Sequence, residues 1–350
     1  MGISFRRFWA MFRARNREFF RDRAAFGWNF LFPFLIVAGF ALIFSGGSQK
    51  TYKIGVAPVS PGGVMDPARA DIPEGLKSIR YTEFIGFDDM SVAVDRLRHH
   101  KIDLLIATGP PPYRYWVSDA SPNGYLMAAL FRDSLQGTAA TAVKEEIHGR
   151  EIRYIDWLFP GILGMNMMFS ALWGVGYVVV RYRKNGVLRR FKATPLTAVE
   201  YLGAQLLSRV FLLMFTLTVV WLGSDMLFSF HVVGRYGDIF LIFLLGSLSM
   251  TGLGLILAAR GTSEEFTSGV LNFISWPMMF LSEVWFSLEG APEWLRAAAK
   301  IFPLTHMLTA VRRVMNDGAG LWDVFPELAI LGVMTIVFLG IGASLFSWTR

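Results

Sequence analysis

Apolar residues along this chain gather into runs that are long enough to cross a membrane as helices. A helix needs about 20 residues to cross roughly 30 Å of hydrocarbon, and charged segments separate the runs. One such run would also suit a buried helix of a large soluble protein, but six predict a polytopic α-helical membrane protein with six transmembrane helices. The runs are residues 27–44, 157–180, 201–223, 239–259, 266–288 and 324–348.

Between the first two runs the pattern changes to short stretches of β-branched and aromatic residues separated by turn residues. With the first transmembrane helix at 26–45, residues 46–156 are expected to form a small α/β domain. Asp88 and Asp89 are predicted as the N-cap region of its first helix. The predicted strands are 52–57, 81–87, 102–107 and 113–117, and the predicted helices are 90–100 and 125–147.

Residues 1–25 have the pattern of a helix that lies in the plane of the membrane surface. Aromatic residues recur at intervals of three and four, and most arginines fall on the opposite face, although Arg15 and Arg23 do not. A nucleic-acid-binding arm is the competing interpretation, which the aromatic face makes less favoured. The predicted membrane-surface residues are Phe5, Phe8, Trp9, Phe12, Arg13 and Arg17.

Charge predicts how the chain is oriented. The 350 residues are 53% hydrophobic and 17% charged, which excludes an ordinary soluble domain and a disordered chain. The net charge of +7 is concentrated in residues 1–25 and 181–200, whereas residues 46–156 hold 13 basic and 14 acidic side chains. Because basic loops stay in the cytoplasm, we expect a multi-pass protein of the inner (plasma) membrane with cytoplasmic termini. The α/β domain is then extracytoplasmic.

The sequence offers no chemistry of its own for catalysis. It has no cysteine and lacks the G-x-x-x-x-G-K-[ST], G-x-S-x-G and H-E-x-x-H motifs. We therefore expect no catalytic residue, no metal and no cofactor on this chain. The predicted spans contain few ionisable groups, among them Arg209 and Glu283, which disfavours an ion-coupled secondary carrier.

Two segments resemble parts of the ABC-2 type transporter permeases. Residues 183–196, RKNGVLRRFKATPL, resemble the cytoplasmic coupling loop of that family. Residues 281–286 (LSEVWF), 292–295 (PEWL) and 302–306 (FPLTH) resemble the outer segment that follows its fifth span. The strands in 46–156 fit the subgroup with a large domain between the first two spans. The sequence departs from the family pattern at two places. No acidic residues immediately precede Gly186, and Glu283 stands at a position where the family commonly has glycine.

The resemblance implies a permease subunit of an ATP-binding cassette exporter. It would pair with a second permease copy or paralogue and with a separate cytoplasmic ATPase that binds ATP and Mg. Its cargo would be hydrophobic or amphipathic, a drug or a lipid, and residues 46–156 would be available to a periplasmic adaptor. Membrane lipids are further partners and nucleic acid is not. The alternatives are a membrane-anchored envelope assembly protein and an ion-coupled carrier.

The resemblance also implies roles for particular residues. Residues 181–200 would form the coupling loop, for which the alternative is a positive patch that only sets topology. Residues 289–315 would form an outer re-entrant segment, for which the alternative is a plain external loop. The residues implied in ATPase coupling are Gly186, Val187, Leu188, Arg189, Arg190, Phe191, Lys192 and Pro195. Those implied at the outer gate or exit are Glu283, Trp285, Trp294, Phe302, Pro303 and His306.

Overall fold

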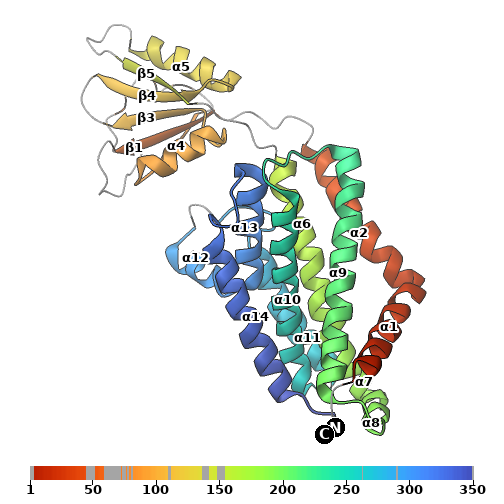
Figure 1. Cartoon of the computed structure of the whole chain (residues 1–350). Coiled ribbons are helices and arrows are strands. Elements are labelled where there is room, and N and C mark those ends of the chain that lie inside the picture. Colours follow the sequence, from red (N-terminus) through yellow and green to blue (C-terminus); the bar gives the residue numbers. More distant parts are fainter. Residues whose placement is uncertain are drawn as a thin grey trace. The chain divides into compact units, whose positions relative to one another are not determined.

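The chain forms two compact units in the computed structural model. One contains Met1–Ile43 and Tyr154–Arg350, and the other contains Phe44–Arg153. Figure 1 shows both units, coloured from the N-terminus to the C-terminus. The structure describes residues 4–44, 52–58, 82–108, 112–135, 142–147, 154–261, 263–288 and 291–348, together with residues 72, 76 and 79.

The first unit is helical. Its central helix is α10 (Tyr236–Arg260), which contacts α14, α13 and α9 (Figure 1). The other helices are α1 (Phe5–Arg21), α2 (Arg23–Phe44), α6 (Tyr154–Ala171), the π-helix η2 (Leu172–Tyr177), α7 (Val178–Lys184), α8 (Val187–Lys192), α9 (Ala198–Phe228), α11 (Glu264–Leu281), α12 (Glu293–Ala299), α13 (Pro303–Asp317) and α14 (Phe325–Leu345).

Each predicted apolar run forms a helix, but not each helix is long and apolar enough to span by itself. Four of the described segments are long and apolar enough to span a membrane: Tyr154–Lys184, Ala198–Phe228, Tyr236–Ala259 and Phe325–Leu345. A fifth is obtained if α1 and residues 26–40, bent by 62° to each other, count as one broken span. The structure therefore establishes four to five candidate spans, and six remains a prediction.

The apolar run at 266–288 is not helical over its whole length. The helix α11 ends at Leu281, because Glu283 has a φ of 58° and no right-handed helix passes through that conformation. It also begins two residues earlier than the run, at Glu264, where the Ser263 side chain accepts a hydrogen bond from the Phe266 N–H. Two acidic residues in its first turn lower its apolar character further.

The helical unit has one large apolar core to which α6, α9, α10 and α13 contribute. It contains many methionines, which fill irregular gaps between helices. Phe159 stacks on Phe230 with ring centroids 3.9 Å apart. At Gly246 any side chain would collide with Met307, so glycine permits the close approach of α10 and α13.

The second unit is built on a five-stranded sheet of order β2-β1-β3-β4-β5. β1 pairs in parallel with β2 and β3, β3 pairs antiparallel with β4, and β4 pairs in parallel with β5. The strands are β1 (Tyr52–Pro58), β2 (Thr82–Gly86), β3 (Leu104–Thr108), β4 (Tyr113–Ser118) and β5 (Ala142–Ile147), and the described helices are α4 (Met90–Arg98) and α5 (Pro122–Ser134).

Alternating side chains of the central strands bury both faces of this sheet. Ile54 and Ile106 pack toward Phe131 of α5, whereas Leu105 packs toward Leu97 of α4. This alternation is the period of two that a strand imposes. The predicted N-cap of the first helix is confirmed, because the Asp89 carboxylate accepts a hydrogen bond from the Ser91 N–H at 2.8 Å.

The helix predicted at 125–147 is wrong in its second half. The helix α5 ends at Ser134, and residues 142–147 form strand β5. Each residue from Ala142 to Ile147 pairs with one from Tyr113 to Ser118. The edge of β4 presents unpaired backbone N–H and C=O groups, and pairing with them outweighs the helical preference of this segment.

Candidate functional site

The coupling segment, residues 181–200, contains the end of α7, the short helix α8 and the start of the long helix α9. Gly186 has a φ of 70° and turns the chain from α7 into α8. On α8 the Leu188 side chain is buried, whereas Arg189 and Arg190 are exposed. Thr197 and Glu200 then form a capping box that begins α9. The segment thus presents basic side chains outward on a short, well-anchored helix.

The remaining predicted coupling residues divide between the inside and the outside of this turn. The Phe191 ring lies 5.8 Å from the Tyr201 ring, and Tyr201 is fully buried against Phe346 and Trp348 of the C-terminal segment. Lys192 and Pro195 are exposed, and Val187 is half-buried.

Arg183, the first residue of the segment that resembles the coupling loop, clamps this segment to two other parts of the unit. Its guanidinium donates hydrogen bonds to the carbonyl oxygens of Ala258 (3.0 Å), Ala259 (3.1 Å) and Gly261 (2.5 Å). It also donates to the Ser347 carbonyl at 3.1 Å. Because the last carbonyls of a helix lack partners within that helix, one arginine satisfies the end of α10 and joins it to α7.

A second connection leads from the coupling segment to the start of α11. The Lys184 ammonium lies 3.4 Å from the Glu264 carboxylate and 3.8 Å from that of Glu265. The Tyr177 hydroxyl donates to Glu264 at 2.7 Å. The acidic start of α11 is therefore paired with the basic end of α7.

A third connection joins α9 to α1 through a buried carboxylate. Glu200 is 1% exposed and accepts hydrogen bonds from the Ser4 N–H (2.6 Å), from the Arg7 guanidinium (2.8 Å to Nη2) and from the Thr197 N–H (2.7 Å). Further along α1, the Ser208 hydroxyl donates to Asn16 at 2.7 Å. The helix α1 is therefore bonded to α9 at two places.

These bonds divide the aromatic face that the sequence predicts for the membrane surface. Phe8 and Phe12 pack against the buried cluster around Tyr201 and Leu202. Trp9 stacks between the Phe5 and Phe12 rings. Phe5 is 76% exposed, and Arg13 and Arg17 are exposed too; their role at a membrane surface stays a prediction. Part of the aromatic face therefore packs against this protein, and part of it is exposed.

The predicted outer-gate residue Glu283 has an unusual backbone and a buried partner. Its φ of 58° lies in the left-handed region that favours glycine. The side chain accepts a hydrogen bond from the Leu288 N–H at 2.8 Å and lies 3.7 Å from the Arg312 guanidinium. Arg312 also donates to the backbone carbonyl of Glu283 at 2.6 Å. The turn is thereby held by its own carboxylate and by one arginine of α13.

Arg312 is a site residue that sequence reasoning missed. It is 8% exposed, donates to the Trp157 carbonyl at 3.1 Å, and lies over the Trp157 ring at 3.8 Å from the centroid. Gly161 of α6 leaves space for it, since a Cβ there would meet the Val284 carbonyl oxygen and the Arg312 guanidinium. A charged residue in the middle of an otherwise apolar helical face was the signal.

The other predicted gate residues do not form a single cluster. The Trp285 ring stacks on Phe40, and its carbonyl accepts from the Tyr154 hydroxyl at 2.6 Å. Trp294 is 70% exposed on α12. Phe302 and Pro303 begin α13, and His306 is buried with Nε2 2.8 Å from the Lys300 carbonyl.

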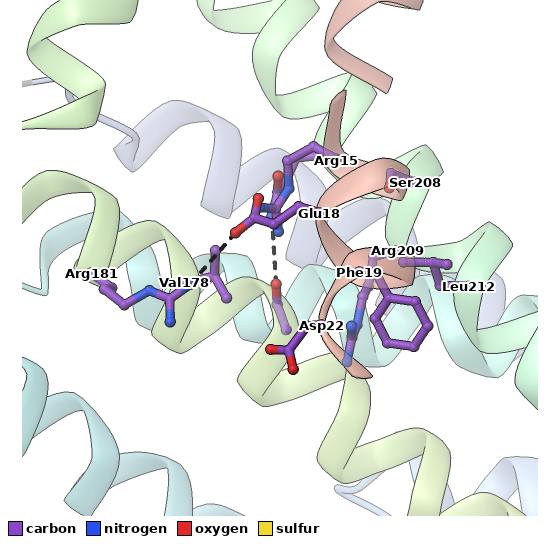
Figure 2. A pocket seen from close by; sticks show the side chains of 11 residues that line it. Arg15, Glu18, Phe19, Asp22, Val178, Arg181, Ser208, Arg209 and Leu212 are labelled. Carbon is purple, nitrogen blue, oxygen red and sulfur yellow. Dashed lines mark hydrogen bonds and ion pairs between the residues drawn. The ribbon is translucent and has the colours of Figure 1, made fainter. Parts of the chain in front are cut away.

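A pocket of about 210 Å³ lies between α1, the η2–α7 region and α9. Figure 2 shows Glu18 between Arg15 and Arg181, at 2.5 Å and 3.6 Å. Arg15 and Glu18 also contact the Tyr182 hydroxyl. The residues that line the pocket are Arg15, Glu18, Phe19, Asp22, Gly174, Val178, Arg181, Gln205, Ser208, Arg209 and Leu212.

The sequence contained a partial signal for this pocket. Arg15 fell outside the arginine face of the N-terminal helix, and in the structure it points into the protein. Arg209 is a charge within an apolar run, whereas nothing in the sequence pattern distinguishes Gln205 and Ser208. Residues four apart share a helix face, so Gln205 lies on the same side of α9 as Arg209.

A bundle of long apolar helices with a basic turn between two of them defines a multi-pass membrane protein. The model of the ABC-2 family transporter proteins matches residues 24–344, so the chain belongs to this family. It is similar to the daunorubicin resistance ABC transporter permease protein DrrB1 of Streptomyces coeruleorubidus, with 25% identity over 189 residues, 53% of this chain and 66% of that protein. It is also similar to the ABC transporter G family member 20 of Dictyostelium discoideum, with 27% identity over 53% of this chain and 26% of that protein. The match thus spans less than two thirds of either relative.

Proposed function

We propose that the chain is the membrane-spanning permease subunit of an ATP-driven exporter, powered by a separate cytoplasmic ATPase that binds ATP and Mg. It works as a pair of permease chains, identical or paralogous. The cargo is hydrophobic or amphipathic, a drug or a lipid. Family membership supports the permease role, and the name of the Streptomyces relative, a daunorubicin resistance permease, supports this cargo class.

The observation that carries the proposal is the construction of α8. Arg189 and Arg190 are exposed on a helix whose Leu188 is fully buried. Exposed basic side chains on a firmly seated helix are suited to a protein partner with acidic groups. A patch that only set topology would need the charges but not the anchoring.

The three connections of the coupling segment supply a route for force. A displacement of α8 acts through Arg183 on α10 and the C-terminal segment. It acts through Lys184 on α11, and through Glu200 on α1. Because hydrogen-bonded side chains in a packed core transmit small shifts between helices, one push on α8 reorients several spans together.

The proposed orientation follows from charge. Both termini, α1 and α8 lie on the cytoplasmic side, and residues 46–156 lie outside, where they are available to an envelope partner. The Glu283–Arg312 pair then braces the outer end of the helical unit, where α12 and α13 form the re-entrant segment beside the exit path.

Charge reversal on α8 tests the proposal. The full chain is purified from its native membranes with its associated proteins, and ATP-dependent export of a fluorescent amphipathic dye is measured in inverted vesicles. Wild-type protein is expected to copurify with an ABC ATPase and to support export. The double variant R189E/R190E is expected to lose the ATPase by at least about tenfold, since each charged contact contributes about 1–3 kcal/mol.

The matched control reverses an exposed arginine on α12, R296E, which lies outside the coupling segment. It is expected to retain the ATPase, which is the readout that this control checks. Absence of any ATPase from the wild-type preparation, with dye export that persists after ATP depletion, contradicts the proposal and favours an ion-coupled carrier. Absence of both the ATPase and export favours an envelope assembly protein.

A further inference from the structure

Arg209 carries a charge inside a long apolar helix without an acidic partner. Its Nη2 donates to the Ser170 carbonyl of α6, and its Nε is buried without a hydrogen-bond partner. Among the residues that the structure describes, no carboxylate forms an ion pair with it. An unpaired charge in a membrane span is costly and marks a functional site.

The surrounding chain is built to hold this guanidinium in place. The helix between α6 and α7 changes to the π-helix η2, a form that occurs frequently at functional sites. At Gly174 in η2 a Cβ would overlap the Arg209 guanidinium, so only glycine leaves room for it. The Gln205 amide donates to the Gly174 carbonyl at 3.4 Å, which joins α9 to η2 at the floor of the pocket.

The floor of the pocket has an acceptor without a partner as well as the unpartnered Nε donor of Arg209. Gln205 is 2% exposed, and its Oε1 is buried without a hydrogen-bond partner. Ser208 is already bonded to Asn16, so it leaves this acceptor unsatisfied. Buried polar groups are normally paired. A ligand that satisfies both groups carries anionic oxygens for Arg209 and a hydroxyl for Gln205.

The charge of the pocket favours an anion. Three arginines, Arg15, Arg181 and Arg209, face two carboxylates, Glu18 and Asp22, which leaves one positive charge. Glu18 is already shared between Arg15 and Arg181. Figure 2 shows Arg209 on α9, apart from these ion pairs and beside Phe19.

The size and walls of the pocket favour a headgroup over a whole amphiphile. Sites for drug-sized molecules measure about 300–1,000 Å³, whereas this pocket measures about 210 Å³. The apolar side chains of Phe19, Val178 and Leu212 line it beside the charged and polar ones. The pocket can therefore enclose a small polar group whose acyl chains stay outside.

We propose that this pocket binds a hydroxyl-bearing phosphate group, with Arg209 as the anion ligand and Gln205 Oε1 as the acceptor for the hydroxyl. A phosphate monoester or a phosphodiester with a hydroxylated headgroup has this chemistry. Two sources can supply it, the headgroup of an anionic phospholipid or free phosphate. The binding does not depend on an ATPase, so it is tested separately from export.

The test measures thermal stabilisation of the purified full-length chain in neutral detergent. The probes are phosphatidylglycerol, phosphatidylcholine as the lipid without a free hydroxyl, and inorganic phosphate. Ligand that binds only the folded state raises Tm. We expect phosphatidylglycerol to raise Tm and phosphatidylcholine not to; a rise with inorganic phosphate alone would support the site with free phosphate as the source.

Two variants make the result specific. Q205E places a carboxylate four residues before Arg209, a favourable spacing for an ion pair on one helix. It is expected to raise Tm without ligand, which shows that it folds, and to abolish the rise caused by the probe. R209Q is expected to weaken binding by about tenfold or more.

The matched control is R189Q, which removes the same charge from exposed α8. It is expected to keep the wild-type response. Equal stabilisation of wild type, Q205E and R209Q by the effective probe would overturn the proposal, as would no response of the wild type to either phosphatidylglycerol or phosphate.

Discussion

Replacing Glu283 separates the effect of its backbone from that of its side chain. Three variants are compared: E283A, E283G and E283Q. Alanine and glycine both remove the hydrogen bond to the Leu288 N–H and the ion pair with Arg312. They differ in how well they adopt the φ of 58° at this position. Glutamine keeps the hydrogen bond and removes only the charge.

The expected magnitudes follow from the local geometry. The side chain of Glu283 is 31% exposed, so the hydrogen bond and the ion pair are screened and contribute about 1 kcal/mol each. A left-handed conformation costs a residue with a Cβ about 1–2 kcal/mol. E283A is therefore expected to lose about 2 kcal/mol. E283G is expected to be about 1 kcal/mol more stable than E283A, because relief of strain exceeds the added entropy of the unfolded chain.

Stability is measured on the full chain in detergent, by denaturant titration followed by circular dichroism. The matched control is Arg296 in the middle of α12, where the order reverses: R296G is expected to be about 1 kcal/mol less stable than R296A, since glycine weakens a helix. E283Q is expected to lie closer to the wild type than E283A. If E283G is no more stable than E283A while the control pair behaves as expected, the inference that the positive φ strains the backbone at residue 283 is wrong.

Three further results are expected. R183A removes four hydrogen bonds to carbonyl oxygens and should lower ATP-driven export by at least about tenfold while ATPase copurification persists; equal loss of both would contradict a role in transmission. E200A leaves Arg7 without its carboxylate and should expose α1 to limited proteolysis, which E265A should not do. The Ser91 N–H holds the pKa of the Asp89 carboxyl below its usual value, so its stabilisation is present above about pH 4 and is lost as the pH falls through the lowered pKa. D89A should reduce the fall of Tm with falling pH, and an unchanged dependence of Tm on pH would refute the contribution of this cap.

Local pattern predicted most of the elements because the forces that form them act within a short stretch of chain. An apolar run in lipid satisfies its backbone hydrogen bonds only as a helix, and each predicted run contains a helix, although the run at 266–288 is helical only as far as Leu281. The Asp89 cap was predictable for the same reason, since its bond reaches only two residues along the chain. The domain boundaries and the extracytoplasmic position of residues 46–156 stay predictions.

Features that depend on distant partners were not predictable in this way. Residues 142–147 became a strand because β4 offers an open edge. The helix α11 ended early because Glu283 turns the chain toward Arg312, which lies 29 residues further on. Arg15 had only the weak signal of an arginine on the wrong face. In each case the deciding contact lies far away in the sequence.

The sequence by itself determined the class of this protein, because long apolar runs with a basic turn between two of them suffice for a multi-pass membrane protein. Only the tertiary structure decided what the individual charges do. Arg183, Arg209 and Arg312 carry the same charged group, yet the first satisfies the end of a helix, the second is buried without a counter-charge among the described residues, and the third braces a strained turn. The physical reason is that hydrophobic transfer follows from composition, whereas the role of a charge depends on the groups within a few ångströms of it.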